Sequence, residues 1–522
     1  MAAVATGPPW SFLRAEPTWA QAADLLDQAH AEGRMSGLDW LRLRNACSVG
    51  RRHPDLLPEL VSEIVAYGPA AAARPSGQRQ LEGPAHAHHD LEHGQVRLGT
   101  VVSHHKNPPS YVNRPFGLNM DVLRTSLVVI GPPGSGKTRS FAKPVVEHLV
   151  IQALANAASV VVVDPKGDDF DIPGWFDHTI DVNNPTAGFS LYGGATDADQ
   201  AADRLASALL PATSGDKAYF IDSSKNALYW VLEAFTQAFG RWPRVRELLG
   251  ALRCDTGVLN NIKAALGQKK LIDDYWPYIE QRKAQAATRV DPAASLIERF
   301  SLLDRPSLVR LFDETRPCFE MRQINSPSRV RVVLAESQYP EASKFLARLV
   351  ISQFVQVTSA PDTNRAIFKG FVCDEAGPFV DDYVSRALQK VRSNNAGLTL
   401  LAQSLGDFPP DLLDTIMGSA GCRALFGGTG PRDAEYFSKL WGSEEISDLS
   451  HSTSRTMSVT ETPLGEPVLR ESVQYGTTVR HVERAIWSPG EIVNSIPAGH
   501  CITSVATSNG HRSPPLLVNL RT

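Results

Sequence analysis

The sequence has no cysteine pair at metal-ligand spacing, no excess of basic charge and no apolar run long enough to cross a membrane. Six cysteines are spread over 522 residues without a CxxC pair, which argues against zinc ribbons and disulfide frameworks and favours a reducing compartment. The 52 basic and 56 acidic residues give a formal net charge of -4, so binding to nucleic acid requires a local basic patch. The longest apolar stretch, 149–163, contains Gln152, Asn156 and Ser159 and is shorter than the ~20 residues of a transmembrane helix.

Residues 1–13 show neither the basic start nor the apolar core of a secretory signal, and we therefore expect a cytoplasmic protein. The hydrophobic fraction of 43% and the charged fraction of 21% are those of ordinary globular proteins, which excludes collagen, coiled coil and wholesale disorder. At roughly 150 residues per domain, the length corresponds to about three domains with a large core.

Residues 1–95 are rich in alanine and proline and contain short amphipathic stretches, so they predict a small helical region followed by a linker. The linker, 72–94, is polar and carries four histidines: His86, His88, His89 and His93. Without cysteine or acidic partners at ligand spacing, these histidines favour a solvated linker over a metal site.

From residue 126 onward, short β-branched apolar runs alternate with helical stretches, which is the pattern of a mainly parallel sheet covered on both faces. The predicted strands are 126–130, 159–163, 330–335, 370–373, 398–401 and 424–427. The long span between the second and third strands shows helical periodicity, so we predict an all-helical insertion at about 195–322 in an α/β core. A Ser/Thr/Gly-rich segment at 450–478 is typical of a mobile loop.

The strongest motif directly follows the first predicted strand and opens an amphipathic stretch, which is the context of a phosphate-binding loop, or P-loop. It consists of Gly131, Pro132, Pro133, Gly134, Ser135, Gly136, Lys137 and Thr138. The glycines let backbone N–H groups turn toward phosphate oxygens, Lys137 reaches the β- and γ-phosphates, and the Thr138 hydroxyl ligates Mg²⁺. The motif therefore predicts a site for a nucleoside triphosphate and Mg²⁺.

Two other strand ends carry polar residues that suit this chemistry. Asp374 and Glu375 follow the fourth predicted strand; we predict that Asp374 holds the metal and that Glu375 orients the attacking water. Asp164 and Lys166 follow the second predicted strand. Because the carboxyl ends of parallel strands share one sheet edge, this pair is placed beside the phosphates. An ordinary strand-to-turn exit is the alternative for Asp164 and Lys166.

Gln403 and Arg392 are candidate sensors of the γ-phosphate. Gln403 ends an apolar run, and its amide can hydrogen-bond both a phosphate oxygen and the attacking water. Arg392 closes a helical stretch, and an arginine at a subunit edge can neutralise charge in a neighbouring site. A surface arginine and a glutamine at the edge of the core are the alternatives for these two positions.

The order of these motifs resembles that of the type IV secretion coupling proteins. These are the conjugative DNA-transfer ATPases of the TraG and TraD type, with a C-terminal region of the TraM-recognition type, in the RecA-like FtsK and HerA superfamily. The resemblance covers roughly residues 90–515. Its pieces are 93–97, 131–138, 163–167, 184–185, 374–376, Arg392, 403–404 and 487–492.

The resemblance implies a domain organisation and a set of partners. The implied parts are a helical N-terminal region and linker at 1–95, a RecA-like nucleotide-binding domain in two pieces at 96–194 and 323–522, and an all-alpha domain at 195–322 that faces the substrate. The family forms homohexameric rings around DNA. ATP and Mg²⁺ are the implied cofactors, Gln403 the implied phosphate sensor, and Arg392 the implied arginine finger acting in trans.

The function implied is ATP hydrolysis coupled to recruiting and translocating DNA, or a DNA conjugate with a relaxase or effector protein, to a type IV secretion apparatus. Most members of the family carry N-terminal transmembrane helices. Here either a partner subunit supplies the contact with the inner face of the cell membrane, or the protein works away from a channel. The alternatives are a soluble duplex-DNA pump of the FtsK or HerA type and a nucleotide-gated adaptor for secreted effectors. Glu375 argues against the adaptor, because a pure switch has no need of a water-orienting base.

Overall fold

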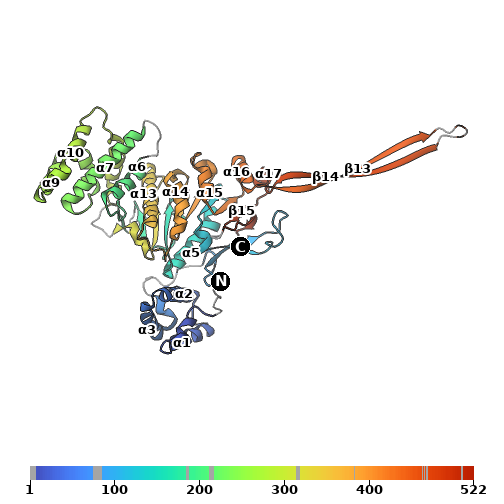
Figure 1. The fold of residues 1–522 in the computed structure, drawn as a ribbon, viewed down its shortest axis with the longest axis horizontal. Helices are drawn as coiled ribbons and strands as arrows, with labels where there is room; N and C mark the ends of the chain where they lie inside the picture. The colour runs from blue at the N-terminus through green and yellow to red at the C-terminus, as the bar shows by residue number, and fades with distance from the viewer. Residues whose placement is uncertain are drawn as a thin grey trace.

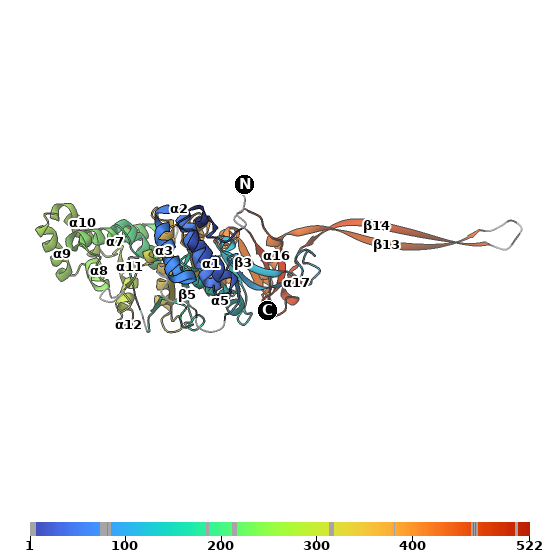
Figure 2. The same cartoon turned by 90° about the horizontal axis from the view of Figure 1, so that it is seen from below.

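The computed structural model describes residues 7–73, 81, 85–183, 187–210, 217–312, 318–380, 382–460, 463, 465, 468–506 and 510–521. A central α/β core carries a small helical bundle near the N-terminus, a helical body at one end and a long β-hairpin at the opposite end (Figure 1). A quarter turn leaves the helical body and the hairpin at opposite ends of the molecule (Figure 2). Among the described residues, none of the helices combines the length and apolarity that a membrane crossing requires.

The core is built on a 12-stranded mixed sheet with the strand order β1-β2-β16-β15-β12-β4-β11-β10-β5-β9-β6, in which β3 also pairs with β2. The neighbouring strands from β12 to β6 run parallel: β12 (Cys422–Phe426), β4 (Leu127–Ile130), β11 (Ala396–Ala402), β10 (Phe368–Cys373), β5 (Ala158–Asp164), β9 (Arg329–Val333) and β6 (His178–Asp181). Antiparallel strands extend one edge: β15 (His500–Val505), β16 (Leu516–Asn519), β2 (Gln95–Val101), β1 (His88–Asp90) and β3 (Pro115–Asn119). The six predicted core strands and the α/β class are confirmed, whereas the antiparallel edge was not predicted.

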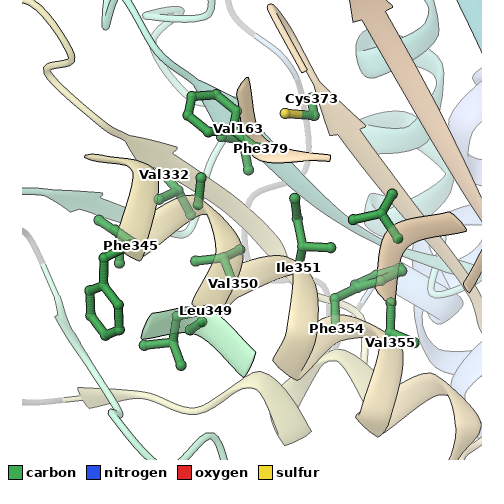
Figure 3. Close-up of a cluster of buried hydrophobic side chains, with 14 of the residues drawn as sticks. Val163, Val332, Phe345, Leu349, Val350, Ile351, Phe354, Val355, Cys373 and Phe379 are labelled. Carbon is green, nitrogen blue, oxygen red and sulfur yellow. The ribbon is translucent and has the colours of Figure 1, made fainter. Parts of the chain in front are cut away.

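Helices cover both faces of the parallel strands. On one face, Val163, Val332 and Cys373 pack in a buried cluster with apolar side chains of α13 (Pro340–Ser359), as Figure 3 shows. The same face is covered further along the sheet by α14 (Asp382–Lys390), α15 (Leu413–Ser419) and α16 (Pro431–Trp441). On the opposite face, Val160 and Val162 pack against α5 (Lys143–Leu154). Burial on both faces explains why these strands are continuous apolar runs. A short helix, α4 (Met120–Leu123), precedes β4.

The helical body lies between β7 (Gly188–Phe189) and β8 (Cys318–Phe319). Within the described residues between these strands, 190–210 and 217–312, the regular elements are helices: α6 (Ala198–Leu209), α7 (Lys217–Phe239), α8 (Val245–Leu252), α9 (Thr256–Gln268), α10 (Ile272–Ala286), α11 (Ala294–Ser301) and α12 (Pro306–Val309). Their apolar faces share one buried cluster with α13. This helical span coincides with the predicted insertion, while the domain boundaries stay a prediction.

The N-terminal bundle contains α1 (Ala20–Ala31), α2 (Gly37–Arg52) and α3 (Leu57–Tyr67) around an apolar cluster of its own. Two side chains of α2 join it to the C-terminal end of α5. Arg42 Nε donates to the Leu154 carbonyl at 2.9 Å, and Asn45 Nδ2 donates to the Ala155 carbonyl at 3.0 Å. These donors satisfy carbonyls that a helix end leaves without intrahelical partners. The bundle is therefore attached to the helix that follows the P-loop.

The hairpin consists of β13 (Ser443–Thr460) and β14 (Val468–Ala485), paired antiparallel from Ser443 with Ala485 to Thr460 with Val468. Each strand has 18 residues, which at ~3.3 Å per residue corresponds to about 60 Å. The hairpin projects away from the core beside α16 and α17 (Pro489–Asn494), as Figures 1 and 2 show. The prediction of a mobile loop at 450–478 is therefore wrong, because a continuous ladder of backbone pairs orders the described part of this segment.

Candidate nucleotide-binding site

The P-loop connects the end of β4 to α5 through a tight turn. The Ser135 N–H donates to the Pro132 carbonyl at 3.1 Å, and Pro133 and Gly134 occupy the two central positions of the turn. Gly134 has a φ of +77°. Proline followed by a residue with positive φ is the arrangement of a type II turn, and it turns the chain back sharply at the carboxyl edge of the sheet.

Two further glycines of the loop are required by its geometry. A Cβ atom at Gly131 would lie 2.6 Å from Ser135 Oγ and 2.8 Å from Phe426 Cβ, so a larger residue would displace the loop. Gly136 has a φ of +97°, a conformation that other residues adopt only with strain. Lys137 follows in a short π-helix, Lys137–Ala142, and is 6% exposed. This strand-loop-helix arrangement is that of a phosphate-binding loop, in which backbone N–H groups and the lysine contact phosphate oxygens.

Thr138 and Asp374 meet at the base of the loop. The Thr138 hydroxyl donates to Asp374 Oδ2 at 2.9 Å, and the backbone N–H of Glu375 donates to Asp374 Oδ1 at 3.0 Å. Asp374 follows β10 and is 2% exposed. Burial raises the pKa of Asp374, and the Thr138 hydrogen bond and the Lys137 charge offset this effect only in part. A buried carboxylate and a hydroxyl in contact form a pair of oxygen ligands that suits Mg²⁺.

Glu375 contacts two other predicted site residues, Lys166 and Gln403. Its Oε1 atom lies 2.8 Å from Lys166 Nζ and accepts a hydrogen bond from Gln403 Nε2 at 3.1 Å. Burial raises the pKa of Glu375, but the Lys166 hydrogen bond and charge, together with Gln403 and Lys137, lower it below its ordinary value. The backbone of Glu375 has a φ of +48°, which costs on the order of 1–3 kcal/mol in a residue other than glycine. The surrounding structure thus holds an ionised carboxylate in a strained position beside the P-loop.

Asp164 is turned into the protein and not toward the loop. Its carboxylate is fully buried, lies 3.1 Å from Arg331 Nη2, and accepts the backbone N–H groups of Gly167 and Phe170 at 2.9 and 3.2 Å. These contacts fix the turn that follows β5. Asp164 therefore orients the segment that presents Lys166, and the sequence analysis gave it a ligand-binding role that these partners do not support.

The structure does not bring Arg392 together with the other site residues. Arg392 lies in a short 3-10 helix, Val391–Asn394, immediately before β11, whereas Gln403 follows the other end of that strand. The seven residues of β11 span about 23 Å at ~3.3 Å per residue. Arg392 is exposed and lies at the amino edge of the sheet, so it does not reach the P-loop of its own chain. The motif residues Asn184 and Pro185 lie outside the described residues.

A cavity of about 740 Å³ opens beside the P-loop. Loop residues Gly134 to Gly136 line it together with residues that the sequence analysis did not assign to the site: His86, Arg97, Arg139, Ser140, Gly499, Leu520 and Arg521. Three guanidinium groups therefore lie around a phosphate-binding loop. Arg97 belongs to the conspicuous 93–97 segment, but Arg521 carries no sequence signal, because β16 places the C-terminal residues here.

The prediction of a solvated histidine linker is wrong for the part that the structure describes, 85–94. Glu147 of α5 accepts the backbone N–H of His86 at 2.9 Å, and its Oε2 lies 2.7 Å from His89 Nε2. His89 also stacks on His148, whose pKa burial lowers to about 3. Burial raises the pKa of Glu147, but these hydrogen bonds and the His89 charge bring it below its ordinary value. Within the described residues, no group of three or more His, Cys, Asp or Glu side chains is arranged to hold a metal ion.

These features define an α/β core with a P-loop at the carboxyl edge of its parallel strands, and comparisons with known proteins extend this description. A family model described as the TraM recognition site of TraD and TraG matches residues 370–494, from β10 to α17. No curated protein sequence matches the chain.

Solved structures of the bacterial conjugative coupling protein TrwB resemble the whole core. Unbound TrwBdeltaN70 is 18% identical with a TM-score of 0.52, over 78% of this chain and 88% of that one. TrwB in complex with ADP and Mg²⁺ is 18% identical with a TM-score of 0.51, over 77% and 86%. TrwB in complex with the ATP analogue ADPNP is 20% identical with a TM-score of 0.50, over the same shares. The structural matches confirm the fold, and together with the family model they confirm the resemblance to coupling proteins of the TraG and TraD type.

Proposed function

We propose that this chain is an ATPase that couples hydrolysis to recruiting and translocating DNA, or a DNA–protein conjugate, to a type IV secretion apparatus. The observation that carries the proposal is the gathering of Thr138, Asp374, Glu375 and Gln403 beside one P-loop. The likeness to conjugative coupling proteins supports it, since one of those structures holds ADP and Mg²⁺.

The residues present fit a magnesium nucleotide. Thr138 and Asp374 offer two oxygen ligands in mutual contact, and the burial that raises the pKa of Asp374 is offset when a divalent cation binds next to it. When bound, Mg²⁺ neutralises charge on the β- and γ-phosphates. In this proposal Lys137 and the loop N–H groups hold the phosphates, and Arg97 and Arg139 lie along the cavity that continues from them.

Glu375 is the proposed water-orienting base. The Lys166 contact outweighs burial and lowers the pKa of Glu375, so its carboxylate is ionised at neutral pH and can accept a hydrogen bond from water. In the present arrangement one of its oxygens is occupied by Lys166 and Gln403. We propose that Lys166 leaves Glu375 for the γ-phosphate, which frees that oxygen to accept a proton from water while Gln403 keeps the amide contact.

Arg392 is proposed to act in trans within a homohexameric ring, because it lies at the sheet edge opposite its own P-loop. The segments 96–194 and 323–522 form the proposed nucleotide-binding domain, and 195–322 forms the domain that faces DNA, relaxase or effector. Any contact with the inner face of the cell membrane is proposed to run through a partner subunit. Phosphate contacts need little sequence readout, so a few lysines and arginines per subunit suffice for DNA despite the negative net charge.

The test is the steady-state ATPase rate of the wild type and of Glu375→Gln, each without DNA, with single-stranded DNA and with duplex DNA, at two salt concentrations. Loss of the base should lower turnover by about 10²-fold or more while nucleotide binding, measured by titration, is retained. Glu341→Gln changes an exposed glutamate whose side chain is 66% exposed and serves as the matched control. Equal turnover in Glu375→Gln and the wild type would show that another residue is the base, and unchanged turnover in Lys137→Ala would remove the motor proposal.

The DNA arms of the same experiment separate the alternatives. Stimulation by single-stranded DNA supports the coupling protein, and stimulation by duplex DNA alone supports a duplex pump. A rate that is flat with all DNA forms favours the effector adaptor. Salt is varied because binding through phosphates weakens steeply as salt rises.

A further inference from the structure

The cavity beside the P-loop has the size of a site for a small molecule. Its volume is about 740 Å³, within the ~300–1,000 Å³ that is usual for ligand pockets. Loop residues 134–136 line it, and so do Arg139 and Ser140, which follow the loop. Asp374 and Glu375 are not among the described residues of its wall. Because P-loop N–H groups hold the α- and β-phosphates, the cavity suits the part of a nucleotide beyond the β-phosphate: the α-phosphate, the ribose and the base.

The wall of this cavity is positively charged. Its described side chains include the guanidinium groups of Arg97, Arg139 and Arg521 and the imidazole of His86, and none of them is a carboxylate. Guanidinium groups donate hydrogen bonds to phosphate oxygens and also stack on flat aromatic rings. A nucleotide offers both kinds of partner, so the chemistry of the wall matches this occupant.

The backbone on either side of Arg521 determines where its side chain lies. Arg521 follows β16, and its N–H donates to Asn519 Oδ1 at 3.0 Å. The N–H of the preceding Leu520 donates to the Gly499 carbonyl at 3.0 Å. The Arg521 side chain lies across Gly499, since a Cβ atom there would be 2.6 Å from its Cγ and 2.7 Å from its Cδ. Glycine at position 499 therefore leaves the space that places Arg521 in the cavity wall.

The guanidinium of Arg521 is available to a ligand. Among the described residues, none forms a hydrogen bond or an ion pair with this guanidinium, whereas Arg97 Nη2 donates to Thr100 Oγ1 at 3.1 Å. The side chains of Leu98 and Leu520 lie in the same wall. Apolar atoms beside a guanidinium suit the flat face of a base better than a phosphate, because a phosphate would lose hydration there.

We propose that Arg521 stacks its guanidinium on the base of the bound nucleotide. This inference rests on the proposed ATPase site and adds to it a residue from the antiparallel edge of the sheet. The contact lies at the nucleoside end, so it holds ATP and ADP alike and takes no part in the transfer of the γ-phosphate. Its loss raises KM and leaves kcat unchanged, because the ground state and the transition state lose the same interaction.

Titration calorimetry of the full-length chain with Mg²⁺ compares ATP with inorganic triphosphate, which lacks ribose and base. Arg521→Ala should weaken ATP binding by roughly 2–30-fold, the strength of one cation–π contact, and should leave the affinity for triphosphate unchanged. Lys137→Ala should weaken both ligands, because Lys137 contacts phosphate. Arg512→Ala removes an exposed arginine of the same segment that does not line the cavity, so this matched control should weaken neither.

The outcomes separate this inference from the ATPase proposal. Unchanged ATP affinity in Arg521→Ala, or equal losses for ATP and triphosphate, would overturn the stacking contact. A lowered kcat with unchanged KM in the same variant would also overturn it. If ATP binding still depends on Lys137 in these cases, the ATPase proposal stands without the contact. A wild type that binds neither ligand would overturn both.

A double-mutant cycle tests how Arg521 is placed. Gly499→Ala puts a methyl group where the Arg521 side chain lies, so it should weaken ATP binding about as much as Arg521→Ala. Residues in contact are coupled, so the double variant should show about the loss of one substitution alone. Gly510 has a φ of +83°, close to the +77° of Gly499, and open space at its Cβ atom. Gly510→Ala therefore controls for backbone strain and should bind ATP as the wild type does. Additive losses in the double variant would show that Gly499 does not act through Arg521 and would overturn the placement.

Discussion

The ion pair between Asp164 and Arg331 is buried at the sheet edge that carries the P-loop. We expect loss of this pair to destabilise the protein. The two side chains are 1% and 4% exposed and 3.1 Å apart. Replacing Asp164 by alanine removes three hydrogen-bonded partners of that carboxylate at once: the guanidinium of Arg331 and the backbone N–H groups of Gly167 and Phe170. Breaking a buried pair by removing one partner costs about 3–5 kcal/mol. At an unfolding entropy of ~2.1 cal/mol/K per residue, the 522 residues give ~1.1 kcal/mol/K, so this cost corresponds to a fall of roughly 3–5 °C in Tm.

Thermal unfolding of nucleotide-free Asp164→Ala, followed by calorimetry, measures this effect. Asp171→Ala is the matched control, because Asp171 contacts the same Arg331 while its own side chain is 76% exposed. An exposed partner is worth about 0–1 kcal/mol, so the control should unfold within about 1 °C of the wild type. A fall below ~2 °C in Asp164→Ala, or equal falls in both variants, would refute the structural role and return Asp164 to the list of ligand-binding candidates.

Three further predictions concern the elements around the P-loop. Gly131→Ala should weaken binding of an ATP analogue by about 5–150-fold, because overpacking costs roughly 1–3 kcal/mol. Gly418→Ala, where a Cβ atom meets open space, should leave the measured binding of the analogue unchanged. Arg42→Ala should lower hydrogen-exchange protection across the 7–73 bundle by about 1.5–3 kcal/mol, the worth of a charged hydrogen bond, and unchanged protection would contradict its docking role. Glu147 has a pKa lowered by folding, so its stabilisation is present at neutral pH and is lost as the pH falls below about 4.3. The urea midpoint of Glu147→Gln should therefore fall less between pH 7 and 3.5 than that of the wild type.

The central strands were predictable because both of their faces are buried. A run such as Val160 to Val163 is apolar at every position, and such runs belong to parallel strands between two layers of helices. The antiparallel strand β15, which lies between β16 and β12, carries a histidine, a threonine and a serine among its six residues and has no such signature. The position of β15 in the sheet is determined by its pairing with β12, whose residues lie about 80 positions away in sequence.

The hairpin shows where composition misleads. Serine, threonine and glycine in 450–478 favour a loop, but they lie mainly at even-numbered positions, which share one face of the hairpin. Met457 and Val459 on one strand, and Leu469 and Val473 on the other, follow the period of two that a strand requires. The alternation of apolar and polar residues alone could have predicted these strands. The average composition of 450–478 hides this alternation.

The sheet order explains which site residues meet and which do not. The strands β4, β11, β10 and β5 are neighbours in that order, so the P-loop, Gln403, Asp374 and Lys166 follow adjacent carboxyl ends. Motif spacing identified these residues, but the Lys166 contact with Glu375 depends on the turn that Asp164 fixes, and this is a tertiary property.

Arg392 precedes β11 and lies at the opposite sheet edge from the P-loop. If Arg392 completes the site of a neighbouring copy, one chain supplies the metal ligands and the water-orienting base, and a second chain supplies the arginine. The positive charge of such an arginine stabilises the transition state and raises the rate by about 10³–10⁵-fold. ATPase activity per subunit should then rise steeply with protein concentration. Mixing Arg392→Ala with Lys137→Ala subunits should restore part of the activity that each lacks alone, because the mixed interface joins an intact P-loop to an intact arginine. A rate per subunit that is independent of concentration, with no recovery on mixing, would place the transition-state charge within a single chain.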